Sequence, residues 1–287
     1  MHANGEPKRN ADRGSGHDAE GEASRTRPAP VPASVRRADH RFGQFEIKFL
    51  LDEAAAARVT EWARVHMGRD PVAACDEHER YPVHSVYLDT PTLGVFGRNG
   101  ALRTRKYRLR RYGNEDTIWL ERKAKIDGRV KKRRTAIGET ELVCLYDQPP
   151  PPHWPGQWFR RRVRLRQLQP VCAVTYERFA RIGLTPEGPI RLTLDRTIGG
   201  CGLQSAGMNG WEVPRGSLAE LQRLSGLCIL ELKYPMSLPA IFKGVISDFS
   251  LEPLKVSKFR TCMQTWVVPD EDAAMSAEST DASRAVA

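Results

Sequence analysis

The sequence predicts an α+β fold in which an antiparallel sheet closes into a barrel, with a few helices packed on the outside. Three observations predict this fold. Several segments spread along the chain alternate charged and apolar residues with period two, as strands with two different faces do. Segments with helical start and stop signals are fewer. The charged residues of the alternating segments are mostly cationic, and a shared interior would gather them in one place.

Both ends of the 287-residue chain are predicted to be disordered. Residues 1–40 are rich in Gly, Pro, Ala, Arg and Glu, and they lack the hydrophobic periodicity needed to bury a core. Residues 268–287 are rich in Ala, Ser, Asp and Glu and lead to the same expectation. The folded domain is therefore predicted over residues 41–267, which is enough for a sizeable core.

The alternation is clear in the first predicted strand. Over residues 45–49, Phe45 and Ile47 point to one face, whereas Glu46 and Lys48 point to the other. The same design or a similar apolar run predicts further strands at 83–88, 102–112, 118–123, 130–137, 171–179, 190–195 and 230–233.

Four segments are predicted to be helical, at 53–67, 157–168, 217–226 and 237–249. Asp52 is a suitable N-cap for the first helix. Ser217 and Glu220 have the spacing of a capping box, which predicts the third. Pro239 just inside the first turn is typical of a helix start and predicts the fourth.

The charge distribution predicts an anionic partner. The formal charge is +10, from 45 Lys and Arg against 35 Asp and Glu. Residues 98–134 alone carry fifteen Lys and Arg against four Asp and Glu, so this segment accounts for the excess. A second cluster, of arginines, occupies residues 160–166. Such a surface attracts polyanions, but the charge alone does not identify them.

Composition excludes several classes of protein. No stretch approaches the roughly 18 apolar residues of a membrane-spanning helix, and we expect no secretory signal at the start. The six cysteines include no Cys-x-x-Cys pair, which excludes a zinc knuckle and does not resemble a secreted disulfide framework. The histidines have no metal-ligand spacing, and no Ser/His/Asp or Cys/His nucleophile set is evident. A cytoplasmic location is therefore expected.

Two arrangements explain the charged strand faces. An ordinary sheet with one wet face explains any single strand, and such charges need no function. A closed barrel with an apolar outside and a charged interior explains all the strands together. Enclosed cations need compensation, and phosphate suits both Arg and Lys. Carboxylates among them, chiefly Glu46, Glu121 and Glu231, would repel phosphate unless Mg²⁺ or Mn²⁺ lay between.

Nine segments, taken in order, resemble a known family. They are 46–48 (EIK), 85–90 (SVYLDT), 107–110 (YRLR), 120–123 (LERK), 130–134 (VKKRR), 176–178 (YER), 191–195 (RLTLD), 230–235 (LELKYP) and 255–259 (KVSKF). Each is weak alone, but together they resemble the VTC catalytic domain, the polyphosphate polymerase branch of the CYTH-like triphosphate tunnel metalloenzymes. The resemblance runs from about Arg41 to Trp266.

The resemblance implies an antiparallel barrel that forms a triphosphate tunnel lined by basic residues. It also implies roles for eight cations in binding the triphosphate or the growing chain: Lys48, Arg108, Arg110, Lys123, Lys132, Arg134, Arg178 and Arg191. Glu231 would hold Mn²⁺ or Mg²⁺, and Lys255 and Lys258 would complete the tunnel near the transferred phosphate. The choice of Lys132 and Arg134 over their neighbours Lys131 and Arg133 depends on a register of one residue.

The implied reaction transfers the γ-phosphoryl of ATP to inorganic polyphosphate and releases ADP. One departure favours this branch: hydrolytic and cyclase members begin with Glu-x-Glu-x-Lys, whereas this chain has Gln44 before Glu46 and Lys48. The alternatives are a tunnel triphosphatase, an inactive polyphosphate-binding module and a basic nucleic-acid binder; we expect no nucleic-acid partner. The resemblance also implies that a membrane subunit is a possible partner, because the family has multi-subunit relatives.

Overall fold

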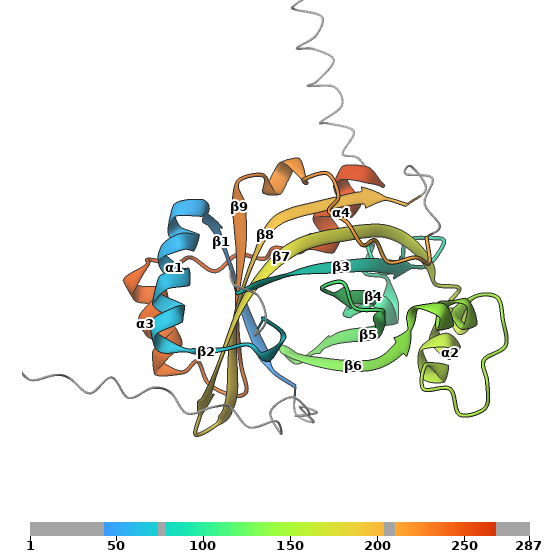
Figure 1. Cartoon of the computed structure of the whole chain (residues 1–287), viewed down its shortest axis with the longest axis horizontal. Coiled ribbons are helices and arrows are strands. Elements are labelled where there is room, and N and C mark those ends of the chain that lie inside the picture. The colour runs from blue at the N-terminus through green and yellow to red at the C-terminus, as the bar shows by residue number, and fades with distance from the viewer. Residues whose placement is uncertain (1–42, 74–78, 204–209, 268–287) are drawn as a thin grey trace, which may run out of the picture.

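The computed structural model describes residues 43–73, 79–203 and 210–267. The predicted disordered tails, residues 1–40 and 268–287, lie outside the described residues. The described part is α+β, with one curled nine-stranded sheet and helices around it (Figure 1). The strands are β1 Phe45–Asp52, β2 Gly68–Arg69, β3 Arg80–Asp89, β4 Arg105–Tyr112, β5 Thr117–Ile126, β6 Arg129–Gly138, β7 Gln169–Thr185, β8 Gly188–Gly202 and β9 Leu227–Tyr234. The α-helices are α1 Glu53–His66, α2 Gln157–Leu165, α3 Ala240–Asp248 and α4 Lys258–Trp266.

The sheet is antiparallel and curls without becoming a closed barrel. Its strand order is β1-β9-β8-β7-β3-β4-β5-β6, and the short β2 pairs with β7. Among the described residues, the edges of β1 and β6 meet at a single bridge. There the Gln44 N–H donates to the Val130 carbonyl at 3.1 Å, and the Val130 N–H donates back at 2.8 Å. The predicted full closure is therefore not seen, because β1 and β6 diverge beyond this bridge.

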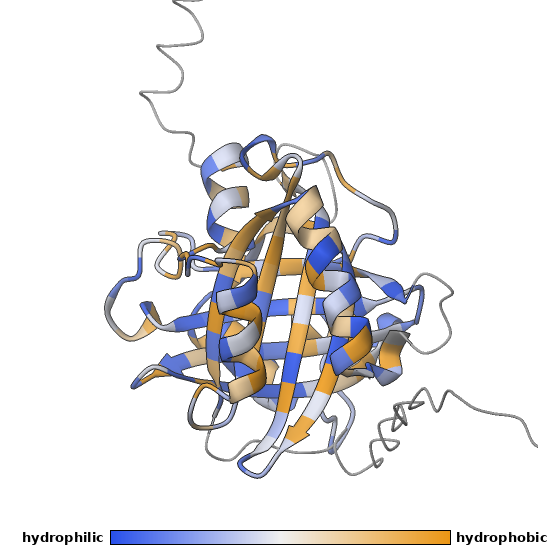
Figure 2. Ribbon diagram, turned by 90° about the vertical axis from the view of Figure 1, so that its left-hand side faces the viewer, coloured by the Kyte–Doolittle hydropathy of each residue, from blue (hydrophilic) through white to orange (hydrophobic). Residues whose placement is uncertain are grey.

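The outer face of β1, β9 and β8 is apolar and is covered by two helices, as the sequence predicts. Ala56 and Val59 of α1 and Phe242 and Val245 of α3 pack in one cluster with the outward residues of these strands. Figure 2 shows the two helices lying along this wall of the sheet. Because alternate residues of a strand point to opposite faces, this packing directs the charged residues of the same strands inward.

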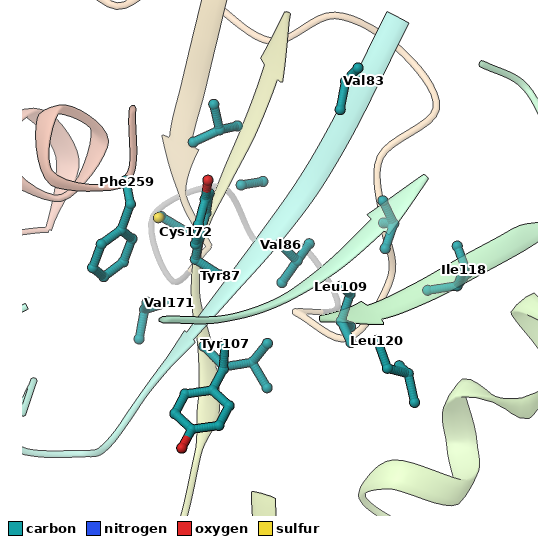
Figure 3. Packing of buried hydrophobic residues seen from close by; sticks show 14 of the residues in the cluster. Val83, Val86, Tyr87, Tyr107, Leu109, Ile118, Leu120, Val171, Cys172 and Phe259 are labelled. Carbon is teal, nitrogen blue, oxygen red and sulfur yellow. The ribbon is translucent and has the colours of Figure 1, made fainter. Parts of the chain in front are cut away.

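A second apolar cluster includes residues from both faces of the sheet, since Tyr87 shares the face of its partner Arg108, which lines the cavity, and Tyr107 lies on the opposite face. It joins β3, β4, β5 and β7 to α2 and α4. The Tyr87 ring packs against Phe259 of α4, with 5.0 Å between centroids, and Tyr107 packs edge-to-face against Phe159 of α2 at 6.3 Å. Figure 3 shows Val86, Tyr107 and several neighbours between the strands. Together the two clusters hold the curl of the sheet.

The helix predictions had mixed outcomes. The first helix is confirmed at α1, where the Asp52 side chain accepts a hydrogen bond from the Ala55 N–H at 2.6 Å. The second is confirmed at α2, although it ends at Leu165 rather than at residue 168. None of the helices in the described ranges combines the length and apolar composition that a bilayer-spanning helix needs.

The helix predicted at 217–226 is wrong. Glu220 instead forms a bridge with Gly199 of β8, and only a 3₁₀ turn follows, at Gln222–Leu224. A Cβ on Gly199 would lie 2.2 Å from the Leu218 carbonyl oxygen, so the glycine lets this segment approach the strand closely. Backbone pairing with the sheet therefore outweighs the capping-box pattern.

The last two helices, α3 and α4, also differ from the sequence analysis. α3 is confirmed, but Pro239 is its N-cap rather than a residue of its first turn. α4 was not predicted. It begins after Ser257, whose side chain accepts a hydrogen bond from the Arg260 N–H at 3.4 Å, and it places Lys258 beside the interior of the sheet.

Candidate phosphate-binding cavity

The curl of the sheet encloses a cavity of about 780 Å³. Its walls come from β1, from β3 to β9 and from the start of α4. Eleven cationic side chains line it: Lys48, Lys106, Arg108, Arg110, Lys123, Lys132, Arg134, Arg178, Arg191, Lys233 and Lys258. The carboxylates that line it are fewer: Glu46, Asp70, Glu115 and Glu231. The cavity is therefore strongly cationic.

The structure brings most of the sequence-predicted site residues together in this cavity. Nine of the ten predicted cations line it, and so does Glu231. Lys255 is the exception, since its side chain is exposed and lies outside the lining. Sequence reasoning did not select Lys106 or Lys233, although Lys106 has the same parity as Arg108 and Lys233 the same parity as Glu231. The period-two pattern was thus a signal that could have found both.

The strand register decides between the two cation pairs of β6. Lys132 and Arg134 face the cavity, and Arg134 lies over the Trp119 ring with its guanidinium carbon 4.5 Å from the centroid. Arg133 lies on the outer face, over the ring of Trp158 at 4.3 Å. Lys123 is the direct partner of Lys132 in the β5–β6 ladder, so both point inward.

Two carboxylates and three lysines form a charged cluster where β1 meets β9. Lys48 Nζ lies 2.9 Å from Glu231 Oε1 and 3.4 Å from Glu46 Oε1. Lys233 Nζ lies 2.5 Å from the other Glu231 oxygen. Lys123 of β5 reaches across the cavity to Glu46 Oε2 at 2.9 Å. Each carboxylate is therefore held between two ammonium groups.

The charges in this cluster shift one another's protonation. Burial and the charge of Glu231 would raise the pKa of Glu46, but Lys123, Lys233 and Lys48 outweigh them and lower it to about 2. Burial would likewise raise the pKa of Glu231, yet Lys233 and Lys48 hold it well below its usual value. Burial lowers the pKa of Lys233 to about 8, against the opposing effect of Glu231 and Glu46. Both carboxylates are thus ionised at neutral pH.

A second ion cluster lies deeper, at Asp195 of β8. Arg178 Nε and Nη2 donate to the two Asp195 carboxylate oxygens at 2.6 and 2.7 Å, and Lys258 Nζ lies 2.5 Å from Oδ2. The Asp195 side chain is fully buried. Burial would raise its pKa, but Arg178 and Lys258 lower it to about 2. Asp195 therefore fixes the positions of Arg178 and Lys258, which both line the cavity.

Glu121 of β5 likewise holds two cations that line the cavity, Arg108 and Lys132. Arg108 Nε donates to Glu121 Oε2 at 2.7 Å, Arg108 Nη2 lies 2.6 Å from the same oxygen, and Lys132 contacts the other oxygen. Burial would raise the pKa of Glu121, but Arg108 and Lys132 hold it well below its usual value. A further acid of the cavity lining, Asp70, binds Arg191 at 2.6 Å.

Three cations that line the cavity have no carboxylate within 4 Å in the described part of the chain: Lys106, Arg110 and Arg134. Lys106 Nζ donates to Ser257 Oγ at 2.7 Å, and Arg110 Nε donates to Ser85 Oγ at 3.0 Å. Burial lowers the pKa of Lys106 well below its usual value, and the charges of Lys48, Lys123 and Arg108 add to this effect. These positions are suited to an anionic ligand, whose charge would offset their mutual repulsion.

The carboxylates fit a divalent metal in a limited way. No group of three or more His, Cys, Asp or Glu side chains that could hold a metal occurs among the described residues. Glu231 and Glu46 lie on either side of Lys48, so the chain offers two carboxylates at one place. Mg²⁺ is commonly bound by one or two carboxylates together with substrate phosphates. The donor set fits a metal whose other oxygen ligands come from the substrate.

Comparisons with known proteins identify the family. No curated protein matches the chain. Three solved structures have similar folds at low scores. A putative adenylate cyclase from Bacillus halodurans has 12% identity, covers 75% of this chain and 95% of its own, and has a TM-score of 0.46. A putative adenylyl cyclase from Hippeastrum, described as having a dominant triphosphatase activity, has 12% identity, coverage of 79% and 98%, and a TM-score of 0.45. The protein PH1819 from Pyrococcus horikoshii has 12% identity, coverage of 77% and 99%, and a TM-score of 0.40.

A family model also matches this part of the chain. The model of the VTC domain matches residues 44–267, which include every strand and helix described above. The resemblance noted in the nine short motifs is thereby confirmed. This chain belongs to the VTC domain family.

Proposed function

We propose that the chain is a polyphosphate polymerase, which transfers the γ-phosphoryl group of ATP to the end of an inorganic polyphosphate chain and releases ADP. The observation that carries the proposal is the cavity lined by eleven cations of the described residues. Donor and acceptor phosphates repel each other, and only a dense cationic site holds both close enough to react. Phosphoryl transfer depends mainly on such positioning and charge stabilisation.

The chain's own residues would divide this task. Arg108, Arg178 and Arg191 are each held by one carboxylate, so their guanidinium groups are oriented before a ligand arrives. Lys106 and Arg110 would bind phosphate oxygens directly, because neither has a carboxylate within 4 Å among the described residues. We assign no role to Lys255, which lies outside the cavity lining.

Glu231, with Glu46 beside it, would hold Mn²⁺ or Mg²⁺. When bound, the metal would neutralise charge on the phosphate oxygens during transfer. Lys48 and Lys233, which contact Glu231, would donate to phosphate oxygens bound beside it. The ATP, the polyphosphate and the metal all belong to the proposal.

The test is a reconstitution with purified protein, ATP and Mn²⁺. We expect chains that resist nuclease, yield to a polyphosphatase and appear together with ADP. Release of inorganic phosphate without chains would refute polymerase activity and indicate a triphosphatase. That second function is favoured by one observation, since Glu46 and Glu231 supply two neighbouring carboxylates of the kind a hydrolytic metal site uses. Gln44, which lines the cavity with an amide, argues against it.

A further inference from the structure

A second group of cations lies outside the cavity, on the outer face of β4, β5 and β6. We call it the outer arginine patch and define it as Arg105, Arg122, Lys131, Arg133 and Arg162. Arg122 is the direct cross-strand partner of Arg133, and Ala124 pairs with Arg105 on one side and Lys131 on the other. α2 lies beside these strands (Figure 1) and contributes Arg162.

The patch is not compensated by the protein. In the described part of the chain, none of its five members has a carboxylate within 4 Å, whereas arginines elsewhere on the outside, such as Arg64, Arg69 and Arg196, are paired with glutamates. Burial lowers the pKa of Arg122, and the guanidinium groups of Arg105, Arg162 and Arg133 lower it further. Like charges placed opposite each other in a sheet are destabilising. An external anion would relieve this cost.

Aromatic contacts argue for phosphates without bases. Single-stranded nucleic acids are held largely by stacking of bases on open aromatic faces. Of the rings beneath the patch, Tyr107 and Phe159 are fully buried. Arg133 covers a face of Trp158, whose indole N–H donates to Thr135 Oγ1 at 2.8 Å. The patch therefore offers mainly guanidinium groups, and Arg133 covers a face of Trp158, the half-buried ring beside it.

Strand β6 joins the patch to the cavity. Its alternate residues point to opposite faces, so Lys132 and Arg134 line the cavity while Lys131 and Arg133 belong to the patch. β6 is an edge strand, and among the described residues only Val130 bridges to the other edge of the sheet. A flexible polyanion could thus pass from one cationic surface to the other around this edge.

We propose that the outer arginine patch binds inorganic polyphosphate that extends beyond the cavity. This inference rests on the proposed function for the identity of its ligand. A long polyphosphate can occupy the cavity and the patch at the same time, and this second contact raises its affinity. Tripolyphosphate is too short to gain in the same way. The site would retain a long chain between successive additions.

The test compares two double variants of the full chain that lose the same charge. Arg105→Gln/Arg133→Gln changes the patch, and Arg58→Gln/Lys243→Gln changes exposed cations on α1 and α3 as the matched control. Binding of tripolyphosphate and of long-chain polyphosphate is measured by calorimetry over a range of salt. We expect the patch variant to bind long chains about tenfold more weakly, with a salt slope shallower by roughly 1.5. Tripolyphosphate binding should be unchanged in both variants.

Several results would overturn the proposal. One is equal long-chain affinity in the two variants; another is a matching loss of tripolyphosphate affinity in the patch variant, which would mean a disturbed cavity. A patch-dependent affinity for single-stranded RNA or for anionic lipid vesicles that exceeds the affinity for polyphosphate would also refute it. If the double variant does not fold, Arg162→Gln on α2 serves the same comparison. The readout of this test is binding and not turnover. A lack of ATP turnover would therefore refute the proposed polymerase activity without changing the conclusion about the patch.

Discussion

Asp195→Asn separates the structural role of the buried acids from the binding role of the cations. Asp195 is fully buried and is bound by Arg178 and Lys258. Asparagine keeps the size of the side chain but removes its charge. The two cations then lose the carboxylate that binds both of them, on the wall of a cavity that we propose to be a phosphate site. Loss of stability and gain in phosphate affinity should therefore occur together.

The size of the effect follows from the burial. Removing one partner of a buried ion pair costs about 3–5 kcal/mol. Arg178 and Lys258 line a cavity that admits water, so the lower end, about 3 kcal/mol, applies here. For a domain of this size, a loss of 1 kcal/mol lowers the melting temperature by about 2–4 °C. The ligand-free variant should thus melt about 6–12 °C below the wild type.

The assay is thermal melting with and without tripolyphosphate, beside Asp70→Asn as the control. Asp70 is itself buried, but its partner Arg191 has a side chain that is 33% exposed and stays partly hydrated, so its loss should cost less, about 1.5 kcal/mol. Tripolyphosphate should restore most of the stability of the Asp195 variant, because its oxygens replace the lost carboxylate. The reasoning is refuted if both variants lose equal stability, or if tripolyphosphate leaves the deficit of the Asp195 variant unchanged.

Three further predictions concern the cavity. Glu231→Gln should abolish chain formation from ATP and Mn²⁺ while tripolyphosphate still binds; retained turnover would show that the metal ligand lies elsewhere. Arg110→Ala should weaken nucleotide binding with little change in melting temperature, because Arg110 has no carboxylate partner in the described structure. Arg108→Ala should weaken nucleotide binding and also lower the melting temperature, because it leaves buried Glu121 with one cation instead of two. Because burial lowers the pKa of Lys233 to about 8, its charge is gained as pH falls through that value, so tripolyphosphate affinity should rise from pH 9 to pH 7; a flat profile in calorimetry would contradict this.

The sequence predicted the faces of the strands better than their closure. Period-two alternation placed Glu46 and Lys48 on the inner face, because the parity of a strand is a local property. Arg108 and Arg178 were expected there only from the family resemblance. Whether β1 and β6 pair along their length depends on sheet curvature, which no local pattern encodes. The same limit applies to Asp195, whose partner Lys258 lies on a helix that the sequence analysis did not predict.

The arrangement of acids explains how a cavity with eleven cations can remain folded without a ligand, and it suggests what the cavity selects. Glu46, Glu121, Asp195 and Glu231 each bind two cations, which fixes the side chains and reduces their repulsion. A phosphate that approaches any of these cations competes with an existing carboxylate, so one phosphate gains little free energy. A chain of phosphates meets several cations and loses its translational freedom only once. These cations include Lys106, Arg110 and Arg134, which have no carboxylate within 4 Å in the described part of the chain. Affinity should therefore climb steeply from orthophosphate to pyrophosphate to tripolyphosphate, and similar affinities for all three in calorimetry would mean that the cations act separately.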